Sequence, residues 1–408
     1  MNKLYPNLVR AVVAAIQQIF NEKRYADKVI EKILKSNKKW GARDRAFIAE
    51  SVYEIVRWWR LLLEISGVGY RETPRHLDEA TIWQIFGTWW LYEGRSLPHW
   101  VEFERINSQQ MQRTYDRVTD IRKIIQSIPE WLDELGEQAL KDRWEIELEA
   151  SNQLAQVVLR TNTLKTTRVA LQKALYEAGI DTYPIKDYPA ALVLKERRNV
   201  FGSELFKKGL FEIQDAGSQA IAEMLAVQPG MRVIDACAGA GGKTLHLAAL
   251  MANQGRIIAL DVVAGKLQEL RKRARRAGIS IVETRPIDNN KVIKRLTASA
   301  DRLLLDVPCS GLGVLRRNPD AKWKLSPDFI TQVQQMQANI LANYSLMVKP
   351  GGQLVYATCS LLPSENEQQV EKFLHENKNR FKLLTERHLT PATHGFDGFY
   401  MAALERVR

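Results

Sequence analysis

The sequence has only three cysteines in 408 residues, too few for the disulfide framework that stabilises many secreted proteins. It has no apolar run long enough to span a bilayer, and its first residues do not form a secretory signal peptide. Internal repeats and low-complexity tracts are absent as well. These absences predict a cytoplasmic protein in a reducing compartment, without a membrane partner.

Acidic residues are fewer than basic ones: 47 Asp and Glu against 59 Lys and Arg give a net charge of +12. A basic chain favours polyanionic partners, and nucleic acid is the first candidate, with a generic basic surface as the alternative. The segment from Lys266 to Arg276 holds six basic residues and one acid, Glu269. Such a run is either a solvated helix face or a helix that faces phosphates.

The length predicts two or three domains, because 408 residues exceed one ordinary core. Nine of the ten tryptophans lie before residue 150, which marks a shift in composition. Apolar residues recur at helical spacing over residues 7–66 and 77–91. We therefore predict an N-terminal all-α domain over residues 1–124.

The pattern changes after a connecting helical segment. Residues 157–162 and 191–194 read as strands, and residues 168–178 read as a helix between them, which predicts a small α+β subdomain over residues 125–215. Five apolar runs then alternate with helical segments, at residues 232–236, 257–261, 281–285, 302–307 and 353–358. This alternation predicts an α/β domain over residues 216–408, with a mostly parallel, doubly wound sheet.

The first of these strands runs into a glycine-rich turn, Cys237-Ala238-Gly239-Ala240-Gly241-Gly242-Lys243, and then into a helix. Glycines let the backbone close around a ligand, and the following helix presents free N–H groups. The turn is not a P-loop, because Cys237 occupies the position of the first glycine. It is not a dinucleotide fingerprint either, because Thr244 occupies the last glycine position. It indicates only a ligand at a switch point of the sheet.

Three carboxylates follow or end the next strands. Asp261 is placed to accept hydrogen bonds from ribose hydroxyls, Asp288 to meet an adenine amino group, and Asp306 ends the fourth strand. A single aspartate at such a position is often a helix cap. Three of them beside a glycine turn favour a nucleoside-binding edge.

Two of the cysteines lie in matching tripeptides, Pro308-Cys309-Ser310 and Thr358-Cys359-Ser360, each directly after a predicted strand. Thiols at the carboxyl ends of strands lie where α/β sheets perform chemistry. A free cysteine is otherwise a small core residue. We favour that inert interpretation for the Cys237 thiol, whose backbone would still contact a cofactor.

With these motifs in place, the sequence resembles the RsmB/Sun family of RNA cytosine-5 methyltransferases. The matching motifs occur in order and are Asp235-Ala236-Cys237-Ala238, Gly241-Gly242-Lys243-Thr244, Asp306-Val307-Pro308-Cys309-Ser310-Gly311, Asn318-Pro319-Asp320-Ala321-Lys322-Trp323, Thr358-Cys359-Ser360 and Pro363-Ser364-Glu365-Asn366. The resemblance is strong over residues 210–408 and extends to about residue 125. One departure is Gly239-Ala240, where the family has Ala-Pro, and the lost proline predicts a more flexible turn.

The resemblance implies a Rossmann-like methyltransferase domain with S-adenosyl-L-methionine as cofactor, a small RNA-recognition subdomain and a NusB-like helical domain. It implies cofactor contacts from Cys237 to Lys243 and from Asp261, Asp288 and Asp306. It assigns the nucleophile to Cys359 and product release to Cys309. Thiol chemistry suits this reaction, because a thiolate that adds to carbon 6 of cytosine makes carbon 5 nucleophilic.

The implied substrate is RNA, with 16S rRNA first, for a protein that we expect to be monomeric and to need no metal. A tRNA substrate and a non-catalytic RNA-binding assembly factor are the alternatives. Lys322 suits a role in shaping the site or contacting RNA, with an ordinary surface lysine as the alternative. The basic residues at 266–276 become candidate phosphate contacts.

Overall fold

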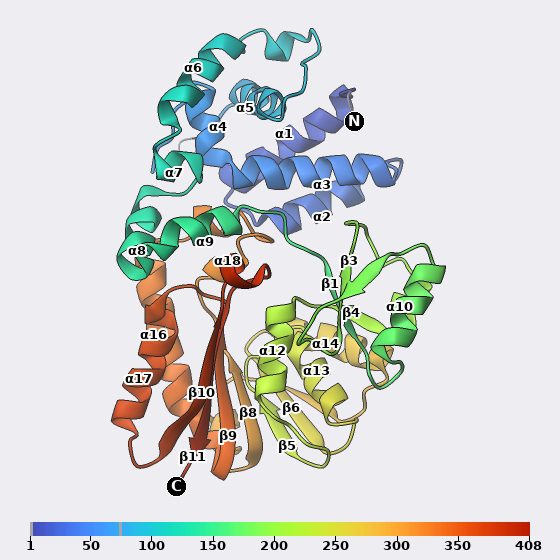
Figure 1. Ribbon diagram of the computed structural model, residues 1–408, viewed down its shortest axis with the longest axis vertical. Helices are drawn as coiled ribbons and strands as arrows, with labels where there is room; N and C mark the ends of the chain where they lie inside the picture. Colours follow the sequence, from blue (N-terminus) through green and yellow to red (C-terminus); the bar gives the residue numbers. More distant parts are fainter. Residues whose placement is uncertain (1–2, 73–75) are drawn as a thin grey trace. The chain divides into compact units, whose positions relative to one another are not determined.

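The computed structural model describes residues 3–72 and 76–408 and divides into two compact units (Figure 1). Unit 1 consists of the described residues up to Gln153 together with Leu315–Ser326, and unit 2 consists of Leu154–Val314 and Pro327–Arg408. The sequence predicts three domains, with boundaries at residues 124 and 215, and this division remains a prediction. The assignment of Leu315–Ser326 to unit 1 has no counterpart in that prediction.

Unit 1 is built from helices, as its apolar spacing predicts. They are α1 (Pro6–Phe20), α2 (Ala26–Ser36), α3 (Ala42–Arg57), α4 (Trp59–Ile65), α5 (Glu79–Tyr92), α6 (Ser108–Val118), α7 (Arg122–Ile125), α8 (Glu130–Leu140) and α9 (Arg143–Ser151), with short 3-10 turns η1 (Val101–Phe103) and η3 (Ala321–Trp323). In α1, Leu8, Val12 and Ile16 lie on one stripe and are buried. Aromatic rings fill much of the remaining core of this unit.

The segment Leu315–Ser326 is fixed inside unit 1 by three hydrogen bonds from different parts of it. The Trp323 indole donates to the carbonyl of Val56 at 2.7 Å. The Arg316 guanidinium donates to the carbonyl of Ala150 at 2.6 Å. The Asp320 carboxylate accepts from the backbone N–H of Ala26 at 2.9 Å. This segment therefore belongs to the helical unit, although it follows Cys309 closely in the sequence.

Unit 2 contains a small antiparallel sheet with the order β2-β3-β1-β4. Its elements are β1 (Val158–Thr161), α10 (Arg168–Glu177), β2 (Thr182–Pro184), β3 (Ala191–Leu194), α11 (Glu204–Lys207) and β4 (Phe211–Ile213). A separate core forms around Leu159, Leu171, Leu192 and Phe211. The predicted strand–helix–strand pattern of this region is confirmed.

The second sheet of unit 2 has seven strands in the order β10-β11-β9-β8-β5-β6-β7. The strands are β5 (Arg232–Asp235), β6 (Arg256–Asp261), β7 (Val282–Pro286), β8 (Ala300–Asp306), β9 (Val348–Thr358), β10 (Phe381–Leu389) and β11 (Phe399–Arg406). The helices are α12 (Ala216–Met224), α13 (Gly242–Leu250), α14 (Ala264–Ala277), α15 (Lys291–Lys294), α16 (Pro327–Tyr344), α17 (Glu367–Glu376) and α18 (Pro391–His394), with short turns η2 (Leu312–Val314), η4 (Ser345–Met347) and η5 (Pro363–Glu365). All five predicted strands are confirmed, and β5 to β9 pair in parallel. The antiparallel strands β10 and β11 were not predicted.

Both faces of this sheet are covered, as the doubly wound prediction requires. Side chains of α12, α13 and α14 join one core, while side chains of α16 and α17 join the other. The strand β5 lies between β6 and β8. The chain adds β6 and β7 on one side of β5 and then crosses to add β8 on the other side. The carboxyl ends of β5 and β8 therefore form the switch point, where α/β sheets bind ligands.

Candidate active site

The register of β8 and β9 brings the two matching tripeptides together. Asp306 lies opposite Ala357 in this parallel pair, so Cys309 and Cys359, a few residues further on, reach the same edge of the sheet. Their Sγ atoms are 3.2 Å apart, and the backbone N–H of Cys359 donates to the Cys309 sulfur at 3.3 Å. The structure thus pairs the two thiols that the sequence placed on separate strands.

The two thiols differ in their electrostatic surroundings. The hydrogen bond with Cys359, burial and the nearby charge of Cys359 raise the pKa of the Cys309 thiol well above its usual range. Cys309 is therefore a thiol that resists ionisation, and either sulfur of the pair can be the hydrogen-bond donor.

A lysine and an aspartate lie beside the thiols. The Lys243 ammonium, in the first turn of α13, pairs with the Asp306 carboxylate at 2.7 Å and lies 5.6 Å from the centre of the Phe399 ring. Burial alone lowers the pKa of Lys243, but Asp306 and the Cys359 sulfur outweigh it, so the pKa of Lys243 is raised. The site therefore holds a positive charge close to the Cys359 sulfur.

The glycine-rich turn has the conformation that its glycines allow. Gly239 and Gly241 have φ angles of +56° and +86°, in the left-handed region. A Cβ atom at Gly241 would lie 2.4 Å from the side chain of Leu270, so only glycine fits there. The Asp261 carboxylate accepts hydrogen bonds from the backbone N–H groups of Gly239 at 2.8 Å and Val263 at 2.7 Å. Asp261 thus holds the turn in place from the end of β6.

The remaining predicted residues lie along the same edge. Asp288 is exposed, just beyond the end of β7, which neighbours β6 in the sheet. The Cys237 thiol follows β5, and its pKa is raised well above the usual range by burial and by the carboxylates of Asp235, Asp306 and Asp261. A thiol that resists ionisation is a poor nucleophile, which supports the inert role favoured for Cys237.

Two arginines, for which the sequence predicted no contact with the glycine-rich turn, hold that turn from β1 and from α14. The buried Arg160 of β1 donates to the carbonyl of Gly242 at 2.6 Å, and Arg273 of α14 donates to the carbonyl of Ala240 at 2.8 Å. Arg273 also pairs with Glu212 of β4 at 3.0 Å. The one signal in the sequence for this contact is the charge of Arg160, which interrupts an otherwise apolar strand.

The basic run of α14 divides into two groups. Arg273 and Arg276 both bind Glu212, so they make internal contacts and the interpretation of the whole run as phosphate contacts is wrong for them. The exposed basic side chains of α14 are Lys266, Arg271, Lys272 and Arg275. The phosphate-contact prediction is therefore restricted to these exposed residues.

Asp235, at the end of β5, was quoted for the family resemblance but was given no role. It is 1% exposed, and its Oδ2 atom accepts a hydrogen bond from the Thr244 hydroxyl at 2.7 Å. Burial raises the pKa of Asp235 to about 7. This buried carboxyl ties the end of β5 to the first turn of α13.

Gly313 fixes the backbone of Cys359. Its N–H donates to the carbonyl of Cys359 at 2.9 Å, and its own carbonyl accepts from the N–H of Gly398 at 2.7 Å. A Cβ atom at Gly313 would lie 2.2 Å from the carbonyl oxygen of Gly398, so a side chain does not fit. No pattern in the sequence distinguishes this glycine from its neighbours.

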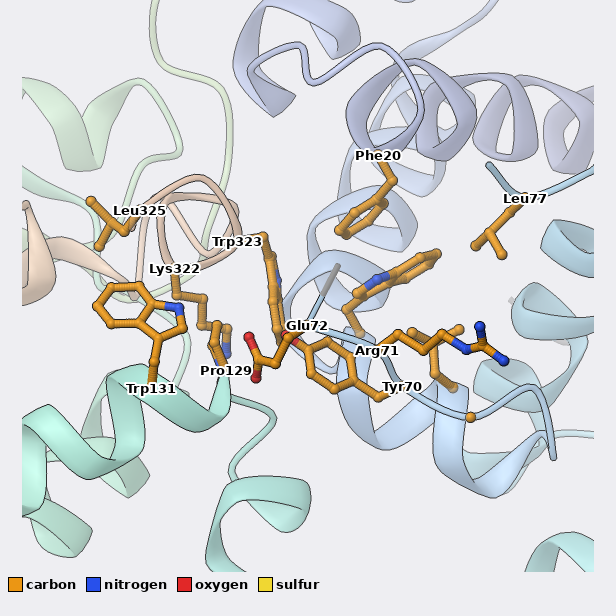
Figure 2. A pocket seen from close by; sticks show the side chains of 13 residues that line it. Phe20, Tyr70, Arg71, Glu72, Leu77, Pro129, Trp131, Lys322, Trp323 and Leu325 are labelled. Carbon is orange, nitrogen blue, oxygen red and sulfur yellow. The ribbon is translucent and has the colours of Figure 1, made fainter. Parts of the chain in front are cut away.

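Lys322 does not lie in the unit that contains the thiols. It is 2% exposed inside unit 1, so the alternative of an ordinary surface lysine is wrong. It contributes to a cavity of about 100 Å³ in unit 1, where Figure 2 shows the rings of Trp131 and Trp323 on either side of its side chain. The cavity is lined by none of the predicted cofactor or catalytic residues.

Two features are absent from the part of the chain that the structure describes. In residues 3–72 and 76–408, His, Cys, Asp and Glu side chains form no group of three or more that could hold a metal ion. None of the helices in the same residues combines the length and the apolar character that a membrane crossing requires.

Comparisons with known proteins agree with this geometry. The family described as 16S rRNA methyltransferase RsmB/F matches residues 222–405, and the ferredoxin-like domain of RsmF/B-like methyltransferases matches residues 128–201. The chain is 32% identical to the probable ribosomal RNA small subunit methyltransferase B of Synechocystis, over 96% of this chain and 98% of that protein.

Two solved structures are similar as well. The crystal structure of PH0851 aligns over 99% of both chains with a TM-score of 0.83 and 26% identity. A methyltransferase homolog protein from Pyrococcus horikoshii covers 70% of this chain and 97% of its own, with a TM-score of 0.62 and 29% identity. The two matched family ranges contain β1, β2 and β3 of the small antiparallel sheet and the seven-stranded sheet up to residue 405.

Proposed function

Because this chain belongs to the RsmB/F family of 16S rRNA methyltransferases, which depend on S-adenosylmethionine, we propose that it methylates carbon 5 of a cytosine in 16S rRNA through a covalent bond to Cys359. The observation that carries the proposal is the pair of thiols, 3.2 Å apart, at the carboxyl ends of neighbouring parallel strands. Few reactions need two thiols at a switch point beside a fixed positive charge.

The first step uses Cys359 as the nucleophile. Its thiolate adds to carbon 6 of the cytosine, a carbon–sulfur bond forms, and electron density moves to carbon 5. The Lys243 ammonium stabilises the negative sulfur before attack, since the two groups are close neighbours in a partly desolvated site. The same ammonium holds the Asp306 carboxylate next to the reacting base.

The last step releases the product. After carbon 5 has gained its methyl group, a base removes the proton from carbon 5, the carbon–sulfur bond breaks, and its electron pair returns to the Cys359 sulfur. Cys309 is placed to assist, because its raised pKa favours a protonated thiol that can donate a hydrogen bond to the Cys359 sulfur, 3.2 Å away. Stabilising the leaving thiolate makes its departure faster.

The residues at the switch point fit S-adenosylmethionine. The Asp261 carboxylate uses one backbone N–H for each oxygen, which leaves acceptor sites free for ribose hydroxyls. The backbone of Cys237 to Lys243 and the carboxylates of Asp288 and Asp306 would form the rest of the site. When bound there, S-adenosylmethionine supplies an electrophilic methyl group.

The proposal extends to how RNA is held. The target cytosine must leave its stack for carbon 6 to reach Cys359. The small sheet, the helical unit and the exposed basic residues of α14 would bind RNA through phosphates and shape. The protein would act as a cytoplasmic monomer. The names of its relatives favour rRNA over the alternative of tRNA.

Substitution of each thiol tests the mechanism. Cys359→Ala should abolish methyl transfer while S-adenosylmethionine binding, measured by calorimetry, is retained. Cys309→Ala should form the bond to cytosine but release it slowly, so that a covalent protein–RNA complex appears on a denaturing gel. Full methyl transfer by Cys359→Ala would sink the assignment of the nucleophile.

A further inference from the structure

Glu365 is a buried carboxylate between the two loops that carry the thiols. It lies at the end of η5 and is 0% exposed. Its Oε2 atom accepts a hydrogen bond from the backbone N–H of Ser310 at 2.8 Å, and its Oε1 atom accepts one from the Ser360 hydroxyl at 2.6 Å. Ser310 directly follows Cys309, and Ser360 directly follows Cys359. One side chain therefore joins the residues next to both thiols.

The surrounding contacts make this connection rigid. The Ser310 and Ser360 hydroxyl oxygens are 3.0 Å apart, and the Gln337 side-chain amide donates to Glu365 Oε2 at 3.0 Å. The backbone carbonyl of Glu365 accepts from the Tyr356 hydroxyl at 2.7 Å. Tyr356 belongs to β9, so Glu365 is fixed both to the strand before Cys359 and to the loop after it.

The burial of a carboxylate at this position costs free energy, which argues that the Glu365 side chain has a functional role. Burying a carboxylate is unfavourable unless hydrogen bonds compensate for lost water. Here the three donors are neutral groups, a backbone N–H, an amide and a hydroxyl, and they match an ionised carboxylate, which only accepts. A neutral or apolar residue would fill the same space at lower cost, but it would not connect the two loops.

We propose that Glu365 is a positioning residue that sets the separation and relative orientation of the Cys309 and Cys359 thiols, an inference that rests on the proposed function of these two residues. The contacts act at one residue beyond each thiol, where a small shift changes the distance between the sulfur atoms. Its negative charge also adds to the effects of Cys359 and of burial in raising the pKa of Cys309. Glu365 thereby supports both the geometry of the pair and the protonated state of Cys309.

Glu365→Gln tests the proposal. Glutamine has nearly the same shape as glutamate, but its NH2 group replaces one carboxylate oxygen and would face a group that already donates a hydrogen bond there. We expect kcat to fall on the order of 10- to 100-fold, with KM for RNA changed less than about threefold, because the loss is one of alignment rather than binding. The matched control is Glu371→Gln, an exposed carboxylate of α17, which should behave as the unchanged protein.

A second measurement reports the thiol separation without RNA. Diamide oxidises two adjacent thiols to a disulfide, taking up their two protons and two electrons. The unchanged protein should form a Cys309–Cys359 disulfide rapidly, and Glu365→Gln should form it at least about tenfold more slowly, because the reaction needs the sulfur atoms to meet. Peptide mapping by mass spectrometry identifies the bond.

The outcomes separate this proposal from the proposed function. An unchanged kcat and an unchanged rate of disulfide formation in Glu365→Gln would overturn the positioning role. A slower disulfide together with no covalent RNA complex in any variant would leave the positioning role intact and refute the proposed mechanism. If Glu365→Gln does not fold, Gln337→Leu removes one donor to the carboxylate, together with the hydrogen bond at 2.9 Å to the carbonyl of Pro308, directly before Cys309. It should slow both reactions in the same direction, and no effect on either would overturn the proposal.

Discussion

The two units of this protein use different residues for their interiors. Unit 1 contains all ten tryptophans and no cysteine, whereas unit 2 contains all three cysteines and no tryptophan. The rings of unit 1 stack on one another, as Phe20 does on Trp59 with 3.7 Å between ring centres. In unit 2, buried polar side chains near the thiols bond to each other: the Ser360 hydroxyl donates to Glu365, and the Thr358 hydroxyl donates to Asn366.

This difference separates stability from chemistry. Large apolar rings contribute buried area and tolerate little change in shape, so they make a stable core. Buried polar groups add little net stability, but they fix the positions of neighbouring atoms within narrow limits. Substitutions in unit 1 should therefore reduce stability, and substitutions around the thiols should reduce the rate of the reaction.

Trp90→Ala should give the largest effect, on the stability of unit 1. Trp90 is 1% exposed, and its indole N–H donates to the carbonyl of Ser96 at 3.0 Å. Removing such a ring costs about 3–5 kcal/mol in the free energy of unfolding. Because every tryptophan lies in unit 1 and every cysteine in unit 2, tryptophan fluorescence and thiol labelling follow the two units separately during urea unfolding.

The fluorescence transition should move to lower urea, and the thiol-labelling transition should move much less. Tyr25→Ala, which removes an aromatic side chain that is 63% exposed, is the control and should shift neither transition appreciably. Equal shifts of both transitions in Trp90→Ala would break the comparison, because they would show that the units unfold together.

Lys243→Met should give the next largest effect, on the reaction rate. The substitution keeps the length of the side chain but removes the charge next to Cys359. Loss of one preorganised electrostatic contact lowers kcat on the order of 10²- to 10³-fold, or about 3–4 kcal/mol. Single-turnover transfer of a labelled methyl group measures the rate, and Lys372→Met, at an exposed position of α17, is the control.

A rate within about threefold of the unchanged protein would contradict the role of Lys243 in stabilising the thiolate. The urea transition followed by thiol labelling should change little, since the ammonium contributes to chemistry more than to folding. If Lys243→Met instead unfolded the protein, the ammonium would be needed for stability, and the division between stability in unit 1 and chemistry in unit 2 would be wrong.

The smallest effect concerns Asp235 and pH. Its pKa is raised from 3.8 to about 7 in the folded chain, so between these values the folded state binds one proton more than the unfolded state. Its contribution to stability is therefore present below about pH 4 and is lost as the pH rises towards about 7. The unchanged protein should therefore gain stability from Asp235 at about pH 5 relative to about pH 8. In Asp235→Asn this gain is lost, so the free energy of unfolding should differ less between the two pH values.

Thiol-monitored urea unfolding of both proteins at the two pH values measures this difference. The same pH dependence in Asp235→Asn and in the unchanged protein would mean that Asp235 does not titrate in this range.

Much of unit 2 could be predicted because its strands have strong local signals. Strands β5, β6, β8 and β9 contain apolar runs, and each predicted strand overlaps an observed one. Strand β10 was missed because most of its residues between Phe381 and Leu389 are exposed and polar, which leaves no apolar pattern. The candidate site followed from strand ends, because the carboxyl ends of parallel strands meet at one edge of a sheet.

The contacts that shape the site could not be predicted, because they join residues far apart in sequence. Glu365 is 55 positions from Ser310, and nothing local indicates that its carboxylate is buried. The membership of Leu315–Ser326 in unit 1 also depends on tertiary contacts. Its one signal was Trp323, the only tryptophan outside the N-terminal region.

The central claim, that Cys359 forms the bond to cytosine, is tested most directly by RNA that contains 5-fluorocytidine. Fluorine at carbon 5 cannot leave as a proton does, so the covalent intermediate should accumulate with S-adenosylmethionine present. Protease digestion and mass spectrometry should then find the modified nucleotide on the peptide that contains Cys359. A nucleotide attached to the Cys309 peptide, or no attachment while normal RNA is methylated, would contradict the account.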